Sequence, residues 1–180
     1  MEEENPIKEQ LFEYIKNSEI KISKLLSQEK PNIIIKDIMN YFLDEIPQEG
    51  KEEHLAVLTT GILHYILTNT MIPSNRKVEF RGIQIDIVIP NLKTLEKDPK
   101  KALIIYIPKT ENKKSIENQV LQLEKIQPEK QNIWIVSSNK LALKNKNFLI
   151  QKEGNFSDII FDIANFVNVQ GNNKLKILKI

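Results

Sequence analysis

The sequence predicts an α/β (α+β) protein, in which a central mixed β-sheet with an αβββαβ core is flanked by helices and carries a helical N-terminal extension. Apolar residues recur at helix-like spacing through the first third of the 180 residues. After Pro73 they alternate or run continuously in short segments, as in strands. A helical pattern between the third and fourth predicted strands favours a crossover connection, which joins parallel strands.

The predicted helices before the sheet follow from this spacing. Apolar residues between 11 and 26 indicate a helical region with a polar interruption near Asn17 and Ser18, and a second helix is predicted from residue 31 to a point before Pro47. A longer helix follows, with Glu52 and Glu53 in its first turn. Acidic residues are favoured there by the positive end of the helix dipole.

The strand predictions rest on alternation and on continuous apolar runs. Residues 77–80 and 83–89 alternate on either side of Gly82 and predict a β-hairpin. Residues 91–101 form a polar, lysine-rich connection. Residues 102–107 are almost entirely apolar, which is typical of a strand that is buried on both faces.

The remaining elements complete the predicted core. Ser115 is the candidate N-cap of a helix that ends at Pro128, and residues 133–136 and 148–150 are predicted strands. Residues 139–146 form a short lysine-rich element between them, and Ser157 with Asp158 opens a final helix.

These elements predict three parts of the chain. Residues 1–50 are the helical N-terminal extension, residues 51–170 are the α/β core, and residues 171–180 are a C-terminal tail. The tail alternates Lys with Ile and Leu, so both an edge strand and a disordered segment remain open.

Composition narrows the possible chemistry. The chain has no cysteine, which excludes disulfides, iron–sulfur clusters and a thiol nucleophile. His54 and His64 lie about 15 Å apart if both are on one helix, too far to bind one metal.

The net charge of +2 favours nucleic-acid contact through a local basic patch over contact through the whole surface. The many Ile, Lys and Glu residues suggest a thermophile.

We expect a soluble cytoplasmic protein with no membrane contact. The first residues are acidic and polar, unlike the start of a signal peptide. The longest apolar stretch, residues 55–67, is too short to cross a bilayer.

Three residues stand out for their positions. Glu53 opens the helix before the hairpin, Asp86 lies in the middle of an apolar strand, and Lys109 ends the third strand. With the αβββαβ order, they resemble the PD-(D/E)XK nuclease superfamily, which has the restriction-endonuclease-like fold. Archaeal Holliday-junction resolvases are among the nearest analogues, and the resemblance covers about residues 51–137. It implies catalytic roles for Asp86, Lys109 and Glu53, with Glu53 and Asp86 helping to hold a divalent metal.

The family pattern is incomplete at its third strand. That strand supplies Asp or Glu, any residue and then Lys, but Ile107 stands two residues before Lys109. Magnesium prefers oxygen ligands and is needed to activate water for phosphodiester hydrolysis. The sequence therefore predicts a degenerate member, unless Glu79 or Glu111 supplies a relocated carboxylate.

Each of these residues also has an ordinary structural interpretation. Asp86 could face solvent or pair with a lysine, because a buried charge is costly without a partner. Lys109 could be one of many lysines at a strand end, and Glu53 a helix-start charge.

Lysines on either side of the third strand form a candidate nucleic-acid contact. If they face one way, they make a patch suited to phosphate in DNA or RNA; the alternative is a solvated loop. The residues are Lys93, Lys97, Lys100, Lys101, Lys113 and Lys114, with Lys109 beside them.

Three functions follow from these observations. The preferred hypothesis is a catalytically inactive nuclease-fold protein that acts as a nucleic-acid-associated or partner-binding accessory module, as a homodimer or with another protein, and that needs no cofactor. The alternatives are an active Mg²⁺-dependent endonuclease with a relocated carboxylate, and a protein-interaction domain with no nucleic-acid role.

Overall fold

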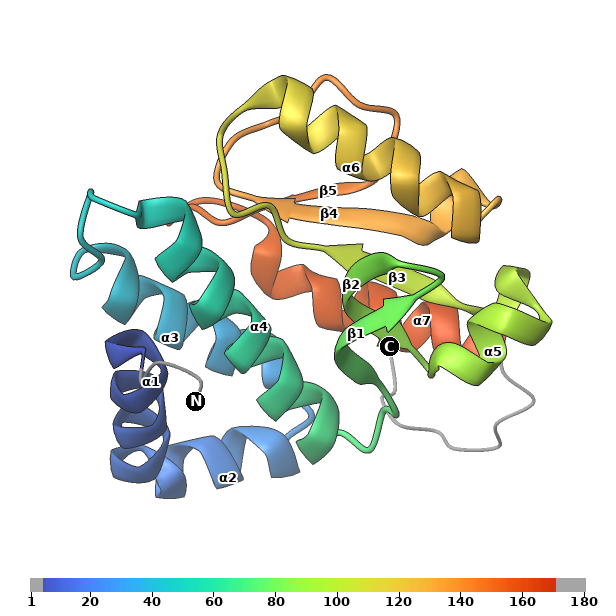
Figure 1. The fold of residues 1–180 in the computed structure, drawn as a ribbon. Helices are drawn as coiled ribbons and strands as arrows, with labels where there is room; N and C mark the ends of the chain where they lie inside the picture. The colour runs from blue at the N-terminus through green and yellow to red at the C-terminus, as the bar shows by residue number, and fades with distance from the viewer. Residues whose placement is uncertain (1–4, 171–180) are drawn as a thin grey trace.

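The computed structural model describes residues 5–170 and contains a mixed sheet between layers of helices (Figure 1). The strand order is β1-β2-β3-β4-β5. The pairs β1–β2 and β2–β3 are antiparallel, and the pairs β3–β4 and β4–β5 are parallel. The mixed sheet and the αβββαβ order confirm the predicted fold class. The predicted C-terminal tail, residues 171–180, lies outside the described residues.

The N-terminal region contains three helices: α1 (Pro6–Asn17), α2 (Glu19–Ser27) and α3 (Pro31–Leu43). The predicted polar interruption is the boundary between α1 and α2. The side chain of Asn5 caps α1 by accepting a hydrogen bond from the Ile7 amide at 3.0 Å. Pro31 begins α3, where its missing N–H costs no helical hydrogen bond.

Helix α4 (Lys51–Asn69) connects this region to the sheet. Gly61 lies on the side of α4 that faces α1, and a Cβ added there would be 2.7 Å from Leu11 Cδ2. The absence of a side chain therefore lets α1 lie close against α4.

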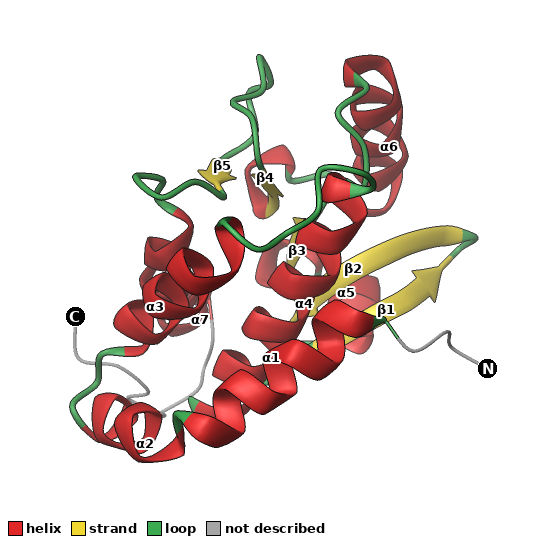
Figure 2. Cartoon of the chain, turned by 90° about the vertical axis from the view of Figure 1, so that its left-hand side faces the viewer, coloured by secondary structure: helices red, strands yellow, loops and turns green. Residues whose placement is uncertain are grey.

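Strands β1 (Asn75–Phe80) and β2 (Ile83–Ile89) form the predicted hairpin, which projects beyond the helices in Figure 2. Val78 pairs with Ile85, and Phe80 pairs with Ile83. The turn places Arg81 at φ 52° and Gly82 at φ 76°. Two residues with positive φ are the signature of the hairpin turn that matches strand twist.

Residues 91–101 hold two short helices that the polar composition did not indicate. They are α5 (Leu92–Lys97) and the 3-10 helix η1 (Pro99–Lys101). The Asn91 side chain caps α5 by accepting a hydrogen bond from the Thr94 amide at 2.9 Å. Leu95 is the only buried residue of α5, so the segment has no apolar periodicity to detect.

Strand β3 (Leu103–Tyr106) and helix α6 (Lys113–Ile126) form the predicted crossover to β4 (Ile133–Ser137). The predicted N-cap of α6 at Ser115 is wrong. Asn112 caps this helix, because its side chain accepts a hydrogen bond from the Ser115 amide at 2.9 Å. An Asn is as good a cap as a Ser, and periodicity alone does not place a helix end to within two residues.

The chain then forms β5 (Asn147–Leu149), the 3-10 helix η3 (Phe156–Asp158) and α7 (Ile159–Gln170). The lysine-rich residues 139–146 have no regular secondary structure. Within residues 5–170, no helix combines the length and the apolar composition that crossing a membrane requires.

Two apolar cores cover the two faces of the sheet. One lies between the sheet and helices α1, α3, α4 and α7, and includes Ile105 and Trp134. The other lies beneath α6 and includes Ile104 and Leu123. Neighbouring residues of β3 thus contribute to opposite cores, which confirms that this strand is buried on both faces.

Candidate functional site

Asp86 lies in the middle of β2, beside the point where β3 ends. Its Oδ2 accepts a hydrogen bond from the Ile107 amide at 2.8 Å. The β2–β3 register pairs Ile87 with Ile105, so Ile107 lies just past the last strand residue, Tyr106. The carboxylate therefore accepts a hydrogen bond from the Ile107 N–H, a main-chain donor beyond the last residue of β3.

Burial dominates the electrostatics of Asp86. It raises the pKa of the carboxyl above its ordinary value, because an ionised group loses hydration there. The hydrogen bond from Ile107 opposes this effect, followed by the charges of Lys109 and Lys77, which also lower the pKa. The pKa of neighbouring Tyr106 is raised to about 12, by burial and then by the Asp86 charge.

Two lysines near Asp86 come from different segments, β1 and the loop after β3. The β1–β2 register places Lys77 opposite Asp86, while Lys109 follows the end of β3. Neither ammonium lies within 4.0 Å of a carboxylate among residues 5–170. Both lysines thus act on Asp86 through longer-range attraction.

Glu53 and Lys109 lie together in a groove of about 440 Å³ where α4 and α6 both begin. Glu53 is exposed in the first turn of α4. Asp86 does not line this groove. The structure therefore brings Glu53 and Lys109 together. It places Asp86 close enough to Lys109 for the lysine charge to lower the pKa of Asp86. The lining residues are Gln48, Gly50, Lys51, Glu52, Glu53, Lys109, Thr110, Glu111 and Asn112.

The carboxylates around this groove do not form a metal-binding cluster. Between residues 5 and 170, no three His, Asp or Glu side chains are placed to hold one ion. Ile107 is only 2% exposed and belongs to the apolar core. The possible substitutes have other partners: Glu79 Oε2 accepts a hydrogen bond from Gln84 at 2.7 Å, and Glu111 Oε1 accepts one from Asn139 at 3.1 Å.

The predicted lysine patch is divided between the two ends of α6. Gln127, just after α6, donates hydrogen bonds to the Pro99 and Ala102 carbonyls, so η1 lies at the C-terminal end of the helix. Lys113 and Lys114 are at its N-terminal end. A helix of 14 residues is about 21 Å long. Lys93, Lys97, Lys100 and Lys101 therefore lie in a separate group from Lys109, Lys113 and Lys114.

The β1–β2 hairpin carries basic residues that the sequence analysis did not single out. Arg76, Lys77 and Arg81 are exposed. Arg76 and Lys77 lie in β1, and Arg81 lies in the turn that follows it. The Arg81 guanidinium lies 4.9 Å from the centre of the Phe80 ring. The sequence did distinguish two of these residues, because Arg76 and Arg81 are the only arginines of the chain.

No protein-family model matches the chain, and a search of curated proteins found no match. Among solved structures, the chain is similar to the restriction endonuclease PspGI in complex with its substrate DNA, with a TM-score of 0.57. The sequences are 14% identical, and the match covers 92% of this chain and 94% of the other. Similarity at this identity concerns the fold. The chain therefore has the restriction-endonuclease-like fold.

Proposed function

We propose that the chain is a nuclease-fold protein that binds nucleic acid without metal-dependent cleavage and acts as an accessory module. The observation that supports this most directly is the hydrogen bond from the Ile107 amide to Asp86 Oδ2. It lies where the family pattern has two metal-binding carboxylates, and the side chain at position 107 is apolar and buried.

This arrangement disfavours a hard cation in two ways. Magnesium requires near-octahedral coordination by oxygen atoms, and position 107 supplies none from its side chain. Burial also raises the pKa of Asp86, which shows that the ionised form is the costly one at this position.

The basic hairpin supports contact with nucleic acid. Arg76, Lys77 and Arg81 are exposed on an element that projects from the body. Lys109 is also exposed, and it lies near this element, because its charge and that of Lys77 both lower the pKa of Asp86. A projecting basic ribbon can reach phosphate groups along a nucleic-acid backbone. The similar PspGI structure contains DNA, which is consistent with such contact.

The helices α1–α3 are the proposed partner-binding or homodimer surface. Three large apolar side chains of this region are solvent-exposed: Phe12 (69%), Ile20 (88%) and Tyr41 (57%). Large apolar side chains that are exposed can mark surfaces that other proteins cover.

The first test is cleavage. Purified protein is incubated with duplex, single-stranded and branched DNA, with Mg²⁺ or Mn²⁺, beside the Asp86→Ala variant. We expect no products from either protein. Cleavage by the wild type that Asp86→Ala abolishes would establish the active-nuclease alternative.

The second test is binding. We expect DNA affinity to fall as salt rises, with a log–log slope reduced by about 0.9 for each phosphate contact removed. Arg76→Gln, Lys77→Gln and Arg81→Gln are combined in one variant, and Lys100→Glu with Lys101→Glu in another. Lys24→Gln with Lys36→Gln, on exposed positions of α2 and α3, is the control. Absent DNA binding would favour the protein-interaction domain, and equal binding by all variants would exclude the hairpin and the lysines of η1 as the contact.

A further inference from the structure

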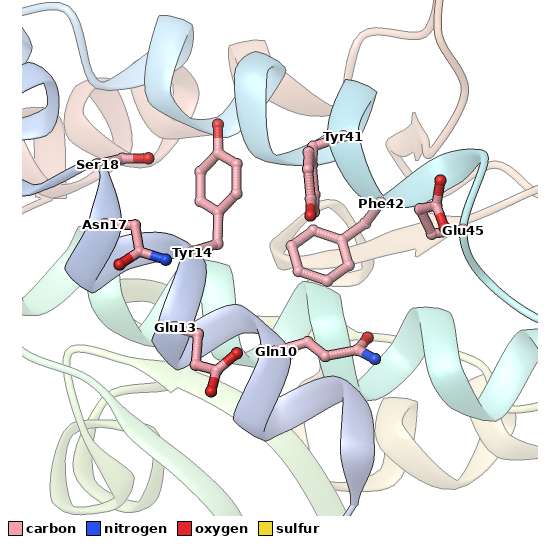
Figure 3. A pocket seen from close by; sticks show the side chains of 8 residues that line it. All are labelled: Gln10, Glu13, Tyr14, Asn17, Ser18, Tyr41, Phe42 and Glu45. Atoms are coloured by element: carbon pink, nitrogen blue, oxygen red, sulfur yellow. The ribbon is translucent and has the colours of Figure 1, made fainter.

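A pocket of about 380 Å³ lies between α1 and α3, on the helical region of the chain (Figure 3). It shares no residue with the groove that contains Glu53 and Lys109. Its walls combine aromatic rings, carboxylates and side-chain amides. The lining residues are Gln10, Glu13, Tyr14, Asn17 and Ser18 from α1 and its C-cap, and Tyr41, Phe42 and Glu45 from α3 and the residues that follow it.

Three aromatic rings form a continuous group in this pocket. The ring centres of Tyr14 and Tyr41 are 4.9 Å apart, and those of Tyr41 and Phe42 are 5.1 Å apart, edge to face. Tyr41 is largely exposed, whereas Phe42 belongs to the core and holds the group in place. The faces of such rings carry negative potential and attract cations within about 6 Å.

Two carboxylates without partners accompany the rings. Glu13 lies on α1 and Glu45 just beyond α3, and Figure 3 shows them on either side of Phe42. In the described part of the chain, neither side chain forms an ion pair or a hydrogen bond, although several other acidic residues pair with lysines. No lysine or arginine lines the pocket.

The end of α3 adds to the negative character. Tyr41 and Phe42 belong to the last turn of α3. The C-terminal end of a helix carries partial negative charge that favours a nearby cation. The end of α1 at Ser18 adds little, because α2 begins there with its positive end. Aromatic faces, carboxylates and the end of α3 thus act in the same direction.

We propose that this pocket binds the guanidinium group of an arginine side chain on a partner protein. A guanidinium is planar and stacks on aromatic faces, and its five donors suit the carboxylate and amide oxygens that line the pocket. A lysine ammonium is more strongly hydrated and offers only three donors.

The test uses the full chain and two probes that differ in charge and hardly at all in shape. N-acetyl-arginine amide and its neutral isostere, N-acetyl-citrulline amide, are titrated while NMR shifts of the Tyr14 and Tyr41 rings are followed. We expect saturable shifts with the arginine compound and none with the citrulline compound. Equal responses to both probes would overturn the proposal.

Variants locate the binding. Glu13→Gln with Glu45→Gln keeps the shape of the pocket and removes its charge, so we expect binding at least about tenfold weaker, equivalent to about 1.4 kcal/mol. Glu9→Gln with Glu19→Gln changes the net charge equally outside the lining and should leave binding unchanged. Equal weakening in both double variants would show a general charge effect and overturn the site.

Two further outcomes decide the source of the arginine. N-acetyl-arginine carries a free carboxylate beside Glu13 and Glu45 and should bind more weakly than the capped compound, whereas tighter binding would indicate a small-molecule site. Self-association that is lost in Arg76→Lys with Arg81→Lys would identify a second copy of the chain as the occupant. Either result would overturn the assignment to a partner protein, without bearing on the DNA tests above.

Discussion

At the scale of single residues, Asp86 concentrates three opposing effects in one carboxyl group. Burial raises its pKa, while the Ile107 amide and the charges of Lys109 and Lys77 lower it. Its position in an apolar strand indicated an unusual residue, but the main-chain partner could not be foreseen. That partner lies 21 residues away and depends on where β3 ends.

Asp86 should make the stability of the fold depend on pH. Because its pKa is raised in the folded protein, the folded state binds this proton more tightly than the unfolded state. Stability from this group is therefore lost as pH rises from the ordinary value of 3.8 through the raised folded value. We expect the free energy of unfolding of Asp86→Asn, measured with urea, to increase relative to that of the wild type as the pH rises from below 3.8 to neutral.

The alanine variant separates the charge from the hydrogen bond. Asp86→Ala leaves the Ile107 amide without its acceptor and should be about 1–3 kcal/mol less stable than Asp86→Asn at neutral pH. A difference between Asp86→Asn and wild type that does not change with pH would contradict the effect of burial on this carboxyl.

At the scale of elements, the C-terminal end of α6 is joined to the start of β3 by one buried amide. Gln127 is fully buried, and its Nε2 donates hydrogen bonds of 2.8 Å to the Pro99 and Ala102 carbonyls. Its Oε1 accepts one from the Glu129 amide at 3.1 Å. Periodicity predicted α6, but a polar residue after its last apolar position gave no sign of this contact.

Replacing Gln127 should loosen this junction. Gln127→Ala removes one of the two donors to the Pro99 carbonyl, the side-chain donor to the Ala102 carbonyl and the acceptor for the Glu129 amide. We expect a loss of about 2–4 kcal/mol in the free energy of unfolding. Gln127→Glu should be no better, because an ionised carboxylate cannot donate to a carbonyl. Thermal and urea unfolding measure both variants.

Gln122→Ala is the matched control on the exposed face of the same helix. It removes an identical side chain and should change stability by less than about 0.5 kcal/mol. If the two alanine variants lose equal stability, the effect belongs to helix propensity and the junction at Gln127 has no special role.

At the scale of the whole molecule, one apolar core connects the N-terminal helices to the sheet. Ile35, Ile38 and Phe42 of α3 belong to the same cluster as Ile105 of β3 and Ile160 of α7. Helix α3 also contacts α7 and η3, and α1 contacts α4. A core that is shared in this way makes the parts unfold together.

Residues 51–170 alone should therefore lack stability, although they are the predicted α/β core. Removing residues 1–50 uncovers the apolar faces of α4 and α7 that α1 and α3 bury. We expect the truncated protein to aggregate or to lose cooperative unfolding, and Phe42→Ala in the full chain to cost about 3–5 kcal/mol. A soluble truncated protein with a sharp thermal transition would contradict this and support an independent core.

The sequence by itself determined the order of helices and strands, the hairpin and the crossover between β3 and β4. Periodicity of 2 or 3.6 residues records which side of each element is buried, and this information is local. It failed where local signals are poor, as in α5 with its single buried residue and at the N-terminal end of α6.

Only the tertiary structure decided which of the candidate residues meet. It placed Glu53 with Lys109 in one groove, joined Asp86 to the Ile107 amide and divided the lysines between the ends of α6. It also formed the aromatic and acidic pocket between α1 and α3. Each of these arrangements joins side chains from separate elements, so it depends on how helices and strands pack together, which the pattern of one segment does not record.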